Sequence, residues 1–129
     1  MKNIILIFIT LFTLVSCEMS SDFQLFQSGK YHGEFKIVYP IGYMTIDTIN
    51  LSIDEDRYKY SSSSSLNYGS GHFIEKSNSI EFSDEVLRNA MLAWTWILSG
   101  TYNLSAKDDT IFLEKVTSSA HCSYKLLRE

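Results

Sequence analysis

The sequence YHGEFKIVY, residues 31–39, alternates apolar or small side chains with polar ones. The apolar or small set consists of Tyr31, Gly33, Phe35, Ile37 and Tyr39, and the polar set consists of His32, Glu34 and Lys36. Successive side chains of a strand point to opposite faces of the sheet. A period of two therefore predicts a strand with one buried face at this position.

Further strands are predicted along the rest of the chain, separated by short polar or glycine-containing turns. They are expected at residues 43–53, 57–62, 66–76, 80–82, 92–106, 110–116 and 122–126. Within residues 43–53 the apolar side chains switch from even-numbered to odd-numbered positions, and therefore from one face of the strand to the other. Such a switch needs an extra residue in the strand, which predicts a β-bulge near Asp47 and Thr48. A short helical turn is expected over residues 84–91, and the strand that follows it is expected to be kinked at Gly100.

About eight strands at regular spacing predict an all-β fold, either an antiparallel barrel or a sandwich. We favour a barrel, because it removes the unpaired strand edges through which a chain rich in aromatic residues would aggregate. The chain contains eight tyrosines and eight phenylalanines but only one proline. The expected barrel domain covers residues 29–129.

Residues 4–15 form a largely apolar run that follows Lys2. A run of this length is typical of a signal peptide, and it is shorter than the roughly 20 apolar residues that span a bilayer. It ends in Leu14-Val15-Ser16-Cys17, which resembles the lipobox of bacterial lipoproteins. The resemblance implies that residues 1–16 are removed and that Cys17 receives acyl chains such as palmitate.

Several acyl chains attach a protein durably to a membrane, whereas one chain gives only marginal binding. We therefore expect Cys17 to anchor the protein in the bacterial cell envelope, in the outer membrane, with residues 17–28 as a tether. The alternative is a soluble secreted protein in which a cysteine follows the apolar run by chance.

Charge and cysteine content limit the function further. Removal of residues 1–16 takes away one positive charge, Lys2, so the formal net charge changes from −4 to −5. Such a chain is not expected to bind nucleic acid, because phosphate contacts need clustered lysine and arginine. Once Cys17 is acylated, Cys122 has no cysteine to pair with, so the domain is expected to depend on packing rather than on a disulfide.

The sequence contains no complete catalytic or metal-binding motif, so we expect neither enzyme activity nor a cofactor. The nearest catalytic arrangement places Ser70 two residues before His72. The strongest candidate for a ligand site is the aromatic row formed by Trp94, Trp96 and Tyr102, which share one strand parity. Such a row either lines a ligand cavity or forms the core, since eight strands leave room only for side chains or one small ligand.

Four features together resemble small Bacteroidetes-type lipoproteins with lipocalin-like barrels. They are the lipobox, GKYHG at residues 29–33, WTWILSGTY at residues 94–102 and YKL at residues 124–126. The resemblance implies a lipocalin-like barrel and carries over no site residue. One departure is that Gly33 is followed by Glu34 and Phe35, where lipocalins carry Gly-x-Trp.

Two functions stay open from the sequence. The first is a non-enzymatic, lipid-anchored module that holds a small apolar or amphipathic ligand inside the barrel, beside Trp94 and Trp96. The second is a protein-interaction module with a solid core, such as an envelope inhibitor or an immunity-type factor, whose partner is an envelope protein. A filled barrel interior would favour the second.

Overall fold

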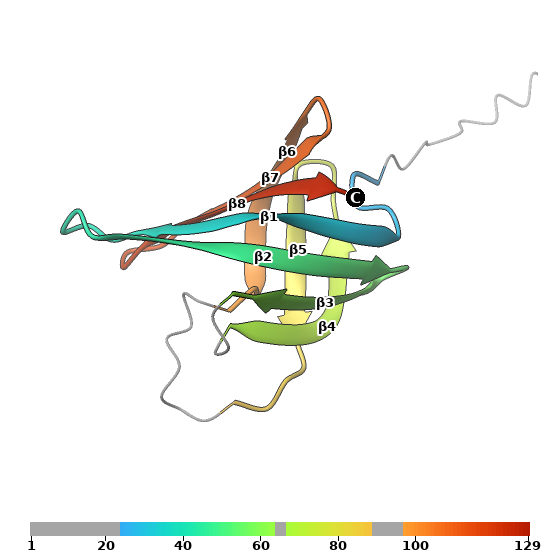
Figure 1. Ribbon diagram of the computed structural model, residues 1–129, viewed down its shortest axis with the longest axis horizontal. Helices are drawn as coiled ribbons and strands as arrows, with labels where there is room; N and C mark the ends of the chain where they lie inside the picture. The colour runs from blue at the N-terminus through green and yellow to red at the C-terminus, as the bar shows by residue number, and fades with distance from the viewer. Residues whose placement is uncertain (1–23, 64–66, 89–96) are drawn as a thin grey trace, which may run out of the picture.

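The structure is a computed structural model, which describes residues 24–63, 67–88 and 97–129. The described residues form eight antiparallel strands that close into a barrel, with β8 beside β1 (Figure 1). This confirms the all-β, eight-stranded antiparallel barrel that the sequence predicts. The strands are β1 (Gly29–Val38), β2 (Met44–Asp54), β3 (Arg57–Ser62), β4 (Tyr68–Glu75), β5 (Ser79–Asp84), β6 (Gly100–Lys107), β7 (Thr110–Val116) and β8 (His121–Arg128).

The core of the barrel is rich in aromatic rings, which come from the strand positions whose side chains face the interior. Phe35 of β1 stacks on Tyr124 of β8, with 4.4 Å between the ring centroids. Phe82 of β5 makes edge-on contacts with Tyr58 at 5.0 Å and with Tyr102 at 5.9 Å. Such pairs contribute roughly 0.5–1.5 kcal/mol beyond the area that they bury. The alternation read from the sequence therefore directs aromatic side chains into one continuous core.

Residues 24–28, which the sequence assigns to the tether, pack against one end of the barrel, and we call them the strap. Phe26 is 1% exposed and its ring contacts Tyr31 and Phe73. The Glu75 carboxylate accepts hydrogen bonds of 2.9 Å from the backbone N–H groups of Leu25 and Phe26. The part of the predicted tether that the structure describes thus belongs to the folded domain.

The bulge predicted near Asp47 and Thr48 is wrong. Pairing between β1 and β2 keeps one register along the whole of both strands. The apolar parity changes because Met44 and Ile46 face outward and are 50% and 52% exposed, whereas the core-facing apolar residues begin at Ile49. The strand is regular, and its first half is apolar on the outside.

The helical turn predicted over residues 84–91 is also wrong where the structure describes it. Asp84 ends β5, and residues 85–88 have no regular secondary structure. The Glu85 N–H donates a 2.9 Å hydrogen bond to the carbonyl of Ser70 on β4, so the chain stays paired with the neighbouring strand instead of turning into a helix. No helix within the described ranges is long and apolar enough to cross a membrane.

The strand predicted over residues 92–106 begins later than expected. Residues 92–96 lie outside the described residues, and residues 97–99 are not in a strand. The strand β6 starts at Gly100, where the chain turns with a φ of 88°. Glycine adopts this conformation without the steric cost that other residues carry, so the predicted kink becomes the start of the strand.

Two glycines allow neighbouring strands to approach closely. A Cβ atom at Gly33 of β1 would lie 1.8 Å from the carbonyl oxygen of Lys125 on β8, and one at Gly71 of β4 would lie 1.9 Å from that of Ser83 on β5. No side chain fits at such distances. Glycines at these places let the sheet coil tightly enough to close, which is the role that the predicted bulge was expected to fill.

Replacing Gly33 with alanine is therefore expected to open the seam between β1 and β8. We expect a loss of about 3 kcal/mol or more in the free energy of unfolding, because the backbone must move to admit the methyl group. Gly42→Ala is the control, since nothing lies within 4 Å of its Cβ position and only its positive φ of 84° opposes a side chain. That change should cost about 1 kcal/mol. Urea denaturation followed by circular dichroism measures both, and equal losses would contradict the closure argument.

Candidate functional site

Of the predicted lipidation site and the predicted aromatic row, only Tyr102 lies in the described part of the chain. Cys17, Trp94 and Trp96 lie outside the described residues. Tyr102 lies in β6, points into the barrel and is 1% exposed. At this position the predicted aromatic row forms part of the core.

The surroundings of Tyr102 contain several polar groups. The Lys115 ammonium lies 4.7 Å from the centroid of the Tyr102 ring and donates a 2.7 Å hydrogen bond to the carbonyl of Ser99. Burial lowers the pKa of Lys115, and burial raises the pKa of the neighbouring Cys122 thiol. The hydroxyls of Tyr102 and Tyr124 are buried and make no hydrogen bond of normal geometry within the described part of the chain. The raised pKa of Cys122 is that of a packed core thiol rather than of a nucleophile.

Two other tyrosines hold residues 97–99 at the end of the barrel opposite the strap. The Tyr58 hydroxyl donates a 3.0 Å hydrogen bond to the carbonyl of Leu98, and the Tyr60 hydroxyl accepts one of 3.1 Å from the Leu98 N–H. Leu98 is fully buried. Burial raises the pKa of Tyr60 to about 12, so its hydroxyl stays neutral at physiological pH. Leu98 thereby occupies one end of the interior as Phe26 occupies the other.

Tyr60 and Tyr102 are expected to respond differently to loss of the hydroxyl, because only the Tyr60 hydroxyl pairs with a buried backbone group. Tyr60→Phe leaves the buried N–H of Leu98 unpaired and should lower the free energy of unfolding by about 1–3 kcal/mol. Tyr102→Phe removes a hydroxyl that makes no hydrogen bond of normal geometry with the described residues, so stability should stay within about 0.5 kcal/mol or rise. Urea denaturation of both variants measures this difference, and a larger loss for Tyr102→Phe would contradict it.

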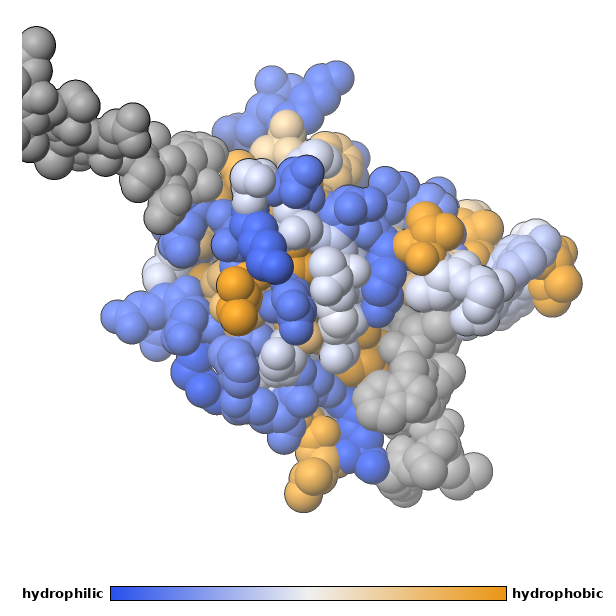
Figure 2. Space-filling model, turned by 180° about the vertical axis from the view of Figure 1, so that it is seen from behind, coloured by the Kyte–Doolittle hydropathy of each residue, from blue (hydrophilic) through white to orange (hydrophobic). Residues whose placement is uncertain are grey.

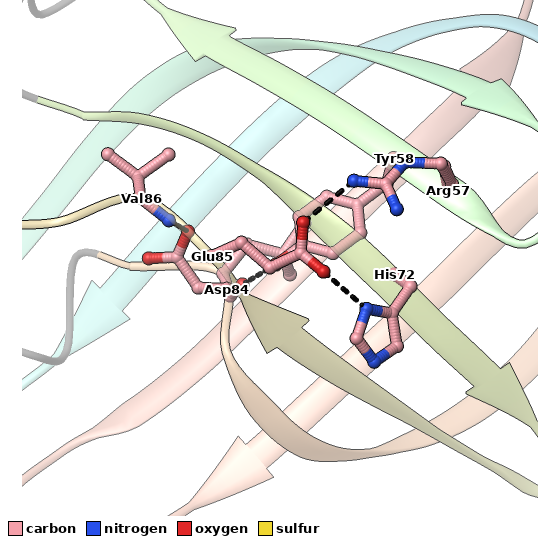
Figure 3. Close-up of polar contacts among 7 residues, drawn as sticks. Arg57, Tyr58, His72, Asp84, Glu85 and Val86 are labelled. Atoms are coloured by element: carbon pink, nitrogen blue, oxygen red, sulfur yellow. Dashed lines mark hydrogen bonds and ion pairs between the residues drawn. The ribbon is translucent and has the colours of Figure 1, made fainter.

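A charged network lies on the outer surface where β3, β4 and the end of β5 meet (Figure 3). The Glu85 carboxylate accepts a 2.7 Å hydrogen bond from Arg57 and lies 2.8 Å from Nδ1 of His72. The hydrogen bonds from Arg57 and then from His72 lower the pKa of Glu85. Beside this exposed network, Asp84 and Arg88 form a 2.8 Å ion pair whose side chains are only 6% and 7% exposed. The buried pair fixes the chain that follows β5 against the barrel.

Each of the three histidines lies beside a glutamate carboxylate. Ser70 and His72 share a face of β4, but the contact made by the His72 ring is with Glu85. His32 and His121 lie beside other glutamates, on β1 and β8. The described ranges contain no group of three or more residues able to hold a metal ion.

Glu85 is expected to contribute to the pH dependence of stability. Its pKa is lower in the folded protein than the ordinary value of 4.5, so its stabilising contribution is complete above that value. The contribution is lost as the pH falls through the lower pKa of the folded state. Glu85→Gln should therefore reduce the fall in melting temperature between about pH 5 and about pH 3, whereas Glu81→Gln on the exposed face of β5 should not. A steeper acid transition in Glu85→Gln would contradict this reading.

A cleft of about 600 Å³ opens at the strap end of the barrel. Leu25, Tyr31 and Ile111 line it with apolar surface, and Asp109 and Arg128 add charge. It lies between the strap and the turn that joins β6 to β7, outside the packed core. A small molecule bound here would lie at the mouth of the barrel rather than within it.

The opposite end of the barrel carries exposed apolar side chains. Met44, Val38 and Val116 lie with His121 in one row across β2, β1, β8 and β7. Val116 is 71% exposed, and Ile41 at the tip of the hairpin between β1 and β2 is 90% exposed. We call the following residues the distal face: Val38, Ile41, Met44, Ile46 and Val116. Figure 2 shows apolar surface at the projecting end of this hairpin, on the right of the view.

Sequence reasoning missed the distal face because it took the outward Met44 and Ile46 as evidence of a bulge. A signal was present, since residues 37–46 contain no charged side chain. A half-buried strand on the surface normally carries polar residues on its outer parity. The lack of charge in residues 37–46 is thus the sequence signal of an apolar outer face on this hairpin.

Comparisons with protein-family models, with curated proteins and with solved structures find no match to this chain. The geometry of the described residues therefore carries the functional argument.

Proposed function

We propose that the protein is a lipoprotein anchored through Cys17 in the bacterial cell envelope, and that its barrel is a non-enzymatic module that binds another envelope protein. The distal face is the binding surface. The observation that carries this proposal is the gathering of apolar side chains at one end of the barrel, where Ile41, Met44, Ile46 and Val116 are exposed and Val38 is half-buried. Apolar patches of this kind mark protein interaction sites in soluble domains.

The packing of the interior supports this function over ligand carriage. Aromatic rings occupy the described core, Phe26 closes the strap end, and Leu98 lies buried at the other end. The strap N–H groups donate hydrogen bonds to the Glu75 carboxylate, and the Tyr58 hydroxyl donates one to the carbonyl of Leu98, so both segments are held in place. A barrel that exchanges an internal ligand needs an entrance, and both ends are engaged by the chain itself.

The position of the distal face supports a partner that lies away from the anchor. The strap precedes Gly29 at the start of β1, and Val38 lies at the other end of the same strand (Figure 1). Ten strand residues span roughly 33 Å. An anchor at Cys17 would hold the strap end near the membrane and leave the distal face free to meet a protein.

The second candidate is a carrier of a small apolar or amphipathic ligand. The cleft beside Leu25, Tyr31 and Ile111 favours it, because these side chains offer an apolar wall with charged groups at the rim. Native mass spectrometry of the protein released gently from its host membrane distinguishes the two candidates. A reproducible extra mass that solvent removes would favour the carrier.

Site-specific photo-cross-linking in host cells tests the proposed function. A photoreactive side chain at Val116 should give a light-dependent adduct with one other envelope protein. The same side chain at Ile74 of β4, which is 59% exposed, should give none. Val38→Glu places a charge in the middle of the distal face and should reduce the Val116 adduct by about tenfold without lowering the melting temperature. Adducts of equal yield from Val116 and Ile74, or no adduct from either, would overturn the proposal.

A further inference from the structure

The cleft at the strap end of the barrel has the size of a small-molecule site. Its volume of about 600 Å³ lies within the range of roughly 300–1,000 Å³ that is usual for ligand pockets. Its apolar wall is formed by Leu25, Ile111 and Leu127, together with Tyr31. A ligand that fills this cleft must therefore present an apolar body to the wall.

Contacts within the domain fix this wall in advance. Leu25 is held by its backbone N–H, which donates a 2.9 Å hydrogen bond to the Glu75 carboxylate. The Tyr31 hydroxyl donates a 2.7 Å hydrogen bond to the carbonyl of Gln27. Tyr31 and Ile111 are only 2% and 7% exposed, so both are also packed against the core. A ligand would thus meet a preformed wall and would not have to order it on binding.

The charged groups that line the cleft are mostly acidic. Asp108, Asp109 and Glu129 each contribute a carboxylate, whereas Arg128 contributes a guanidinium. Lys107 precedes the turn between β6 and β7, but it does not line the cleft. The lining therefore carries a net negative charge at neutral pH. An acidic rim beside an apolar wall favours a ligand that joins a cation to an apolar body.

The guanidinium and the carboxylates differ in what they already bind. Arg128 donates a 2.8 Å hydrogen bond to the side-chain oxygen of Gln27 and one of 2.6 Å to the carbonyl of Ser28. Asp108 and Asp109 are exposed, and among the described residues no hydrogen bond or ion pair engages their carboxylates. The cleft consequently offers free acceptors to a cation, while its guanidinium holds the strap against β8.

We propose that the strap-end cleft binds a small organic ammonium ion, a primary amine that is protonated at neutral pH and carried on an apolar body. The apolar body packs on Leu25, Ile111 and Leu127, and the ammonium donates hydrogen bonds to the carboxylates of the turn between β6 and β7. A primary ammonium has three donors and no acceptor, so it suits a rim of carboxylates. The inference deepens the second candidate function, on which it rests, and it is independent of the distal face.

Photoaffinity labelling of the full chain in its host membranes tests this inference. Three probes share one short alkyl chain with a diazirine and a terminal alkyne, and they end in an amine, an alcohol or a carboxylate. Mass spectrometry of the labelled chain identifies the modified residues. We expect the amine probe to label residues that line the cleft about tenfold more than the carboxylate probe does, and an excess of hexylamine to suppress this label.

Matched variants separate charge from packing. Asp109→Asn removes one carboxylate from an exposed turn and should lower labelling by the amine about threefold, without changing labelling by the alcohol. Glu81→Gln makes the same change in net charge on the outer surface of β5 and should alter neither. Leu127→Ser removes part of the apolar wall and should lower labelling by both probes. Unaltered melting temperatures establish that the variants are folded.

The outcomes distinguish failure of the inference from failure of the second candidate function. Equal labelling of the cleft by all three probes, or an amine label that Asp109→Asn leaves unchanged, would overturn the inference but would still support a small-ligand carrier. The absence of label in the cleft from every probe would overturn both. None of these results bears on the adduct at Val116, so the distal face is tested separately.

A primary ammonium in the cell envelope has two sources, a free amine and the headgroup of phosphatidylethanolamine. Transfer of the full chain to phosphatidylcholine nanodiscs distinguishes them, because the quaternary ammonium of choline has no N–H donor. A higher yield of the amine label in these nanodiscs than in host membranes would show that ethanolamine headgroups compete for the cleft. An unchanged yield would exclude the headgroup and leave a free amine as the ligand. Either result is consistent with an ammonium site.

Discussion

Closure of the sheet between β1 and β8 is the constraint on which the rest of the structure depends. At Gly33 the backbones approach so closely that a Cβ atom would lie 1.8 Å from the carbonyl oxygen of Lys125. Gly71 permits a similar approach to β5. These contacts coil the sheet around an interior narrow enough for rings such as Phe35, Tyr124 and Phe82 to fill. Aromatic packing and strand pairing are therefore consequences of one geometric condition.

Closure also explains why one end of the barrel projects. The strand β2 has 11 residues, whereas its neighbour β3 has six. A closed sheet of strands with unequal lengths leaves the longer hairpin without a partner along part of its length. Most of the apolar distal face lies on this overhang, where the pairing of β2 with β3 has ended.

The strands and the closed fold could be predicted from the sequence because they depend on local alternation. Residues 110–116 were predicted as a strand and form β7 with the same bounds. The errors arose where apolar character did not indicate burial or where the backbone had a partner on a neighbouring strand. Met44 and Ile46 are apolar but face outward, and the N–H of Glu85 bonds to Ser70 of β4 rather than entering a helix. The distal face depends on which strands extend beyond their neighbours in the sheet, and this cannot be predicted from a single sequence.

The outer surface of the barrel provides the strongest argument that the distal face has a purpose. On the other strands the outward-facing positions carry charged residues, such as Lys59 on β3 and Glu81 on β5, with single apolar residues such as Ile74 among them. Selection for folding and solubility alone would favour charged residues at the outward positions of the first half of β2 as well, because outward side chains add nothing to the core. Ile41, Met44 and Ile46 instead expose apolar surface together at one end. Because an exposed apolar hairpin promotes aggregation, its presence is best explained by a partner that covers it.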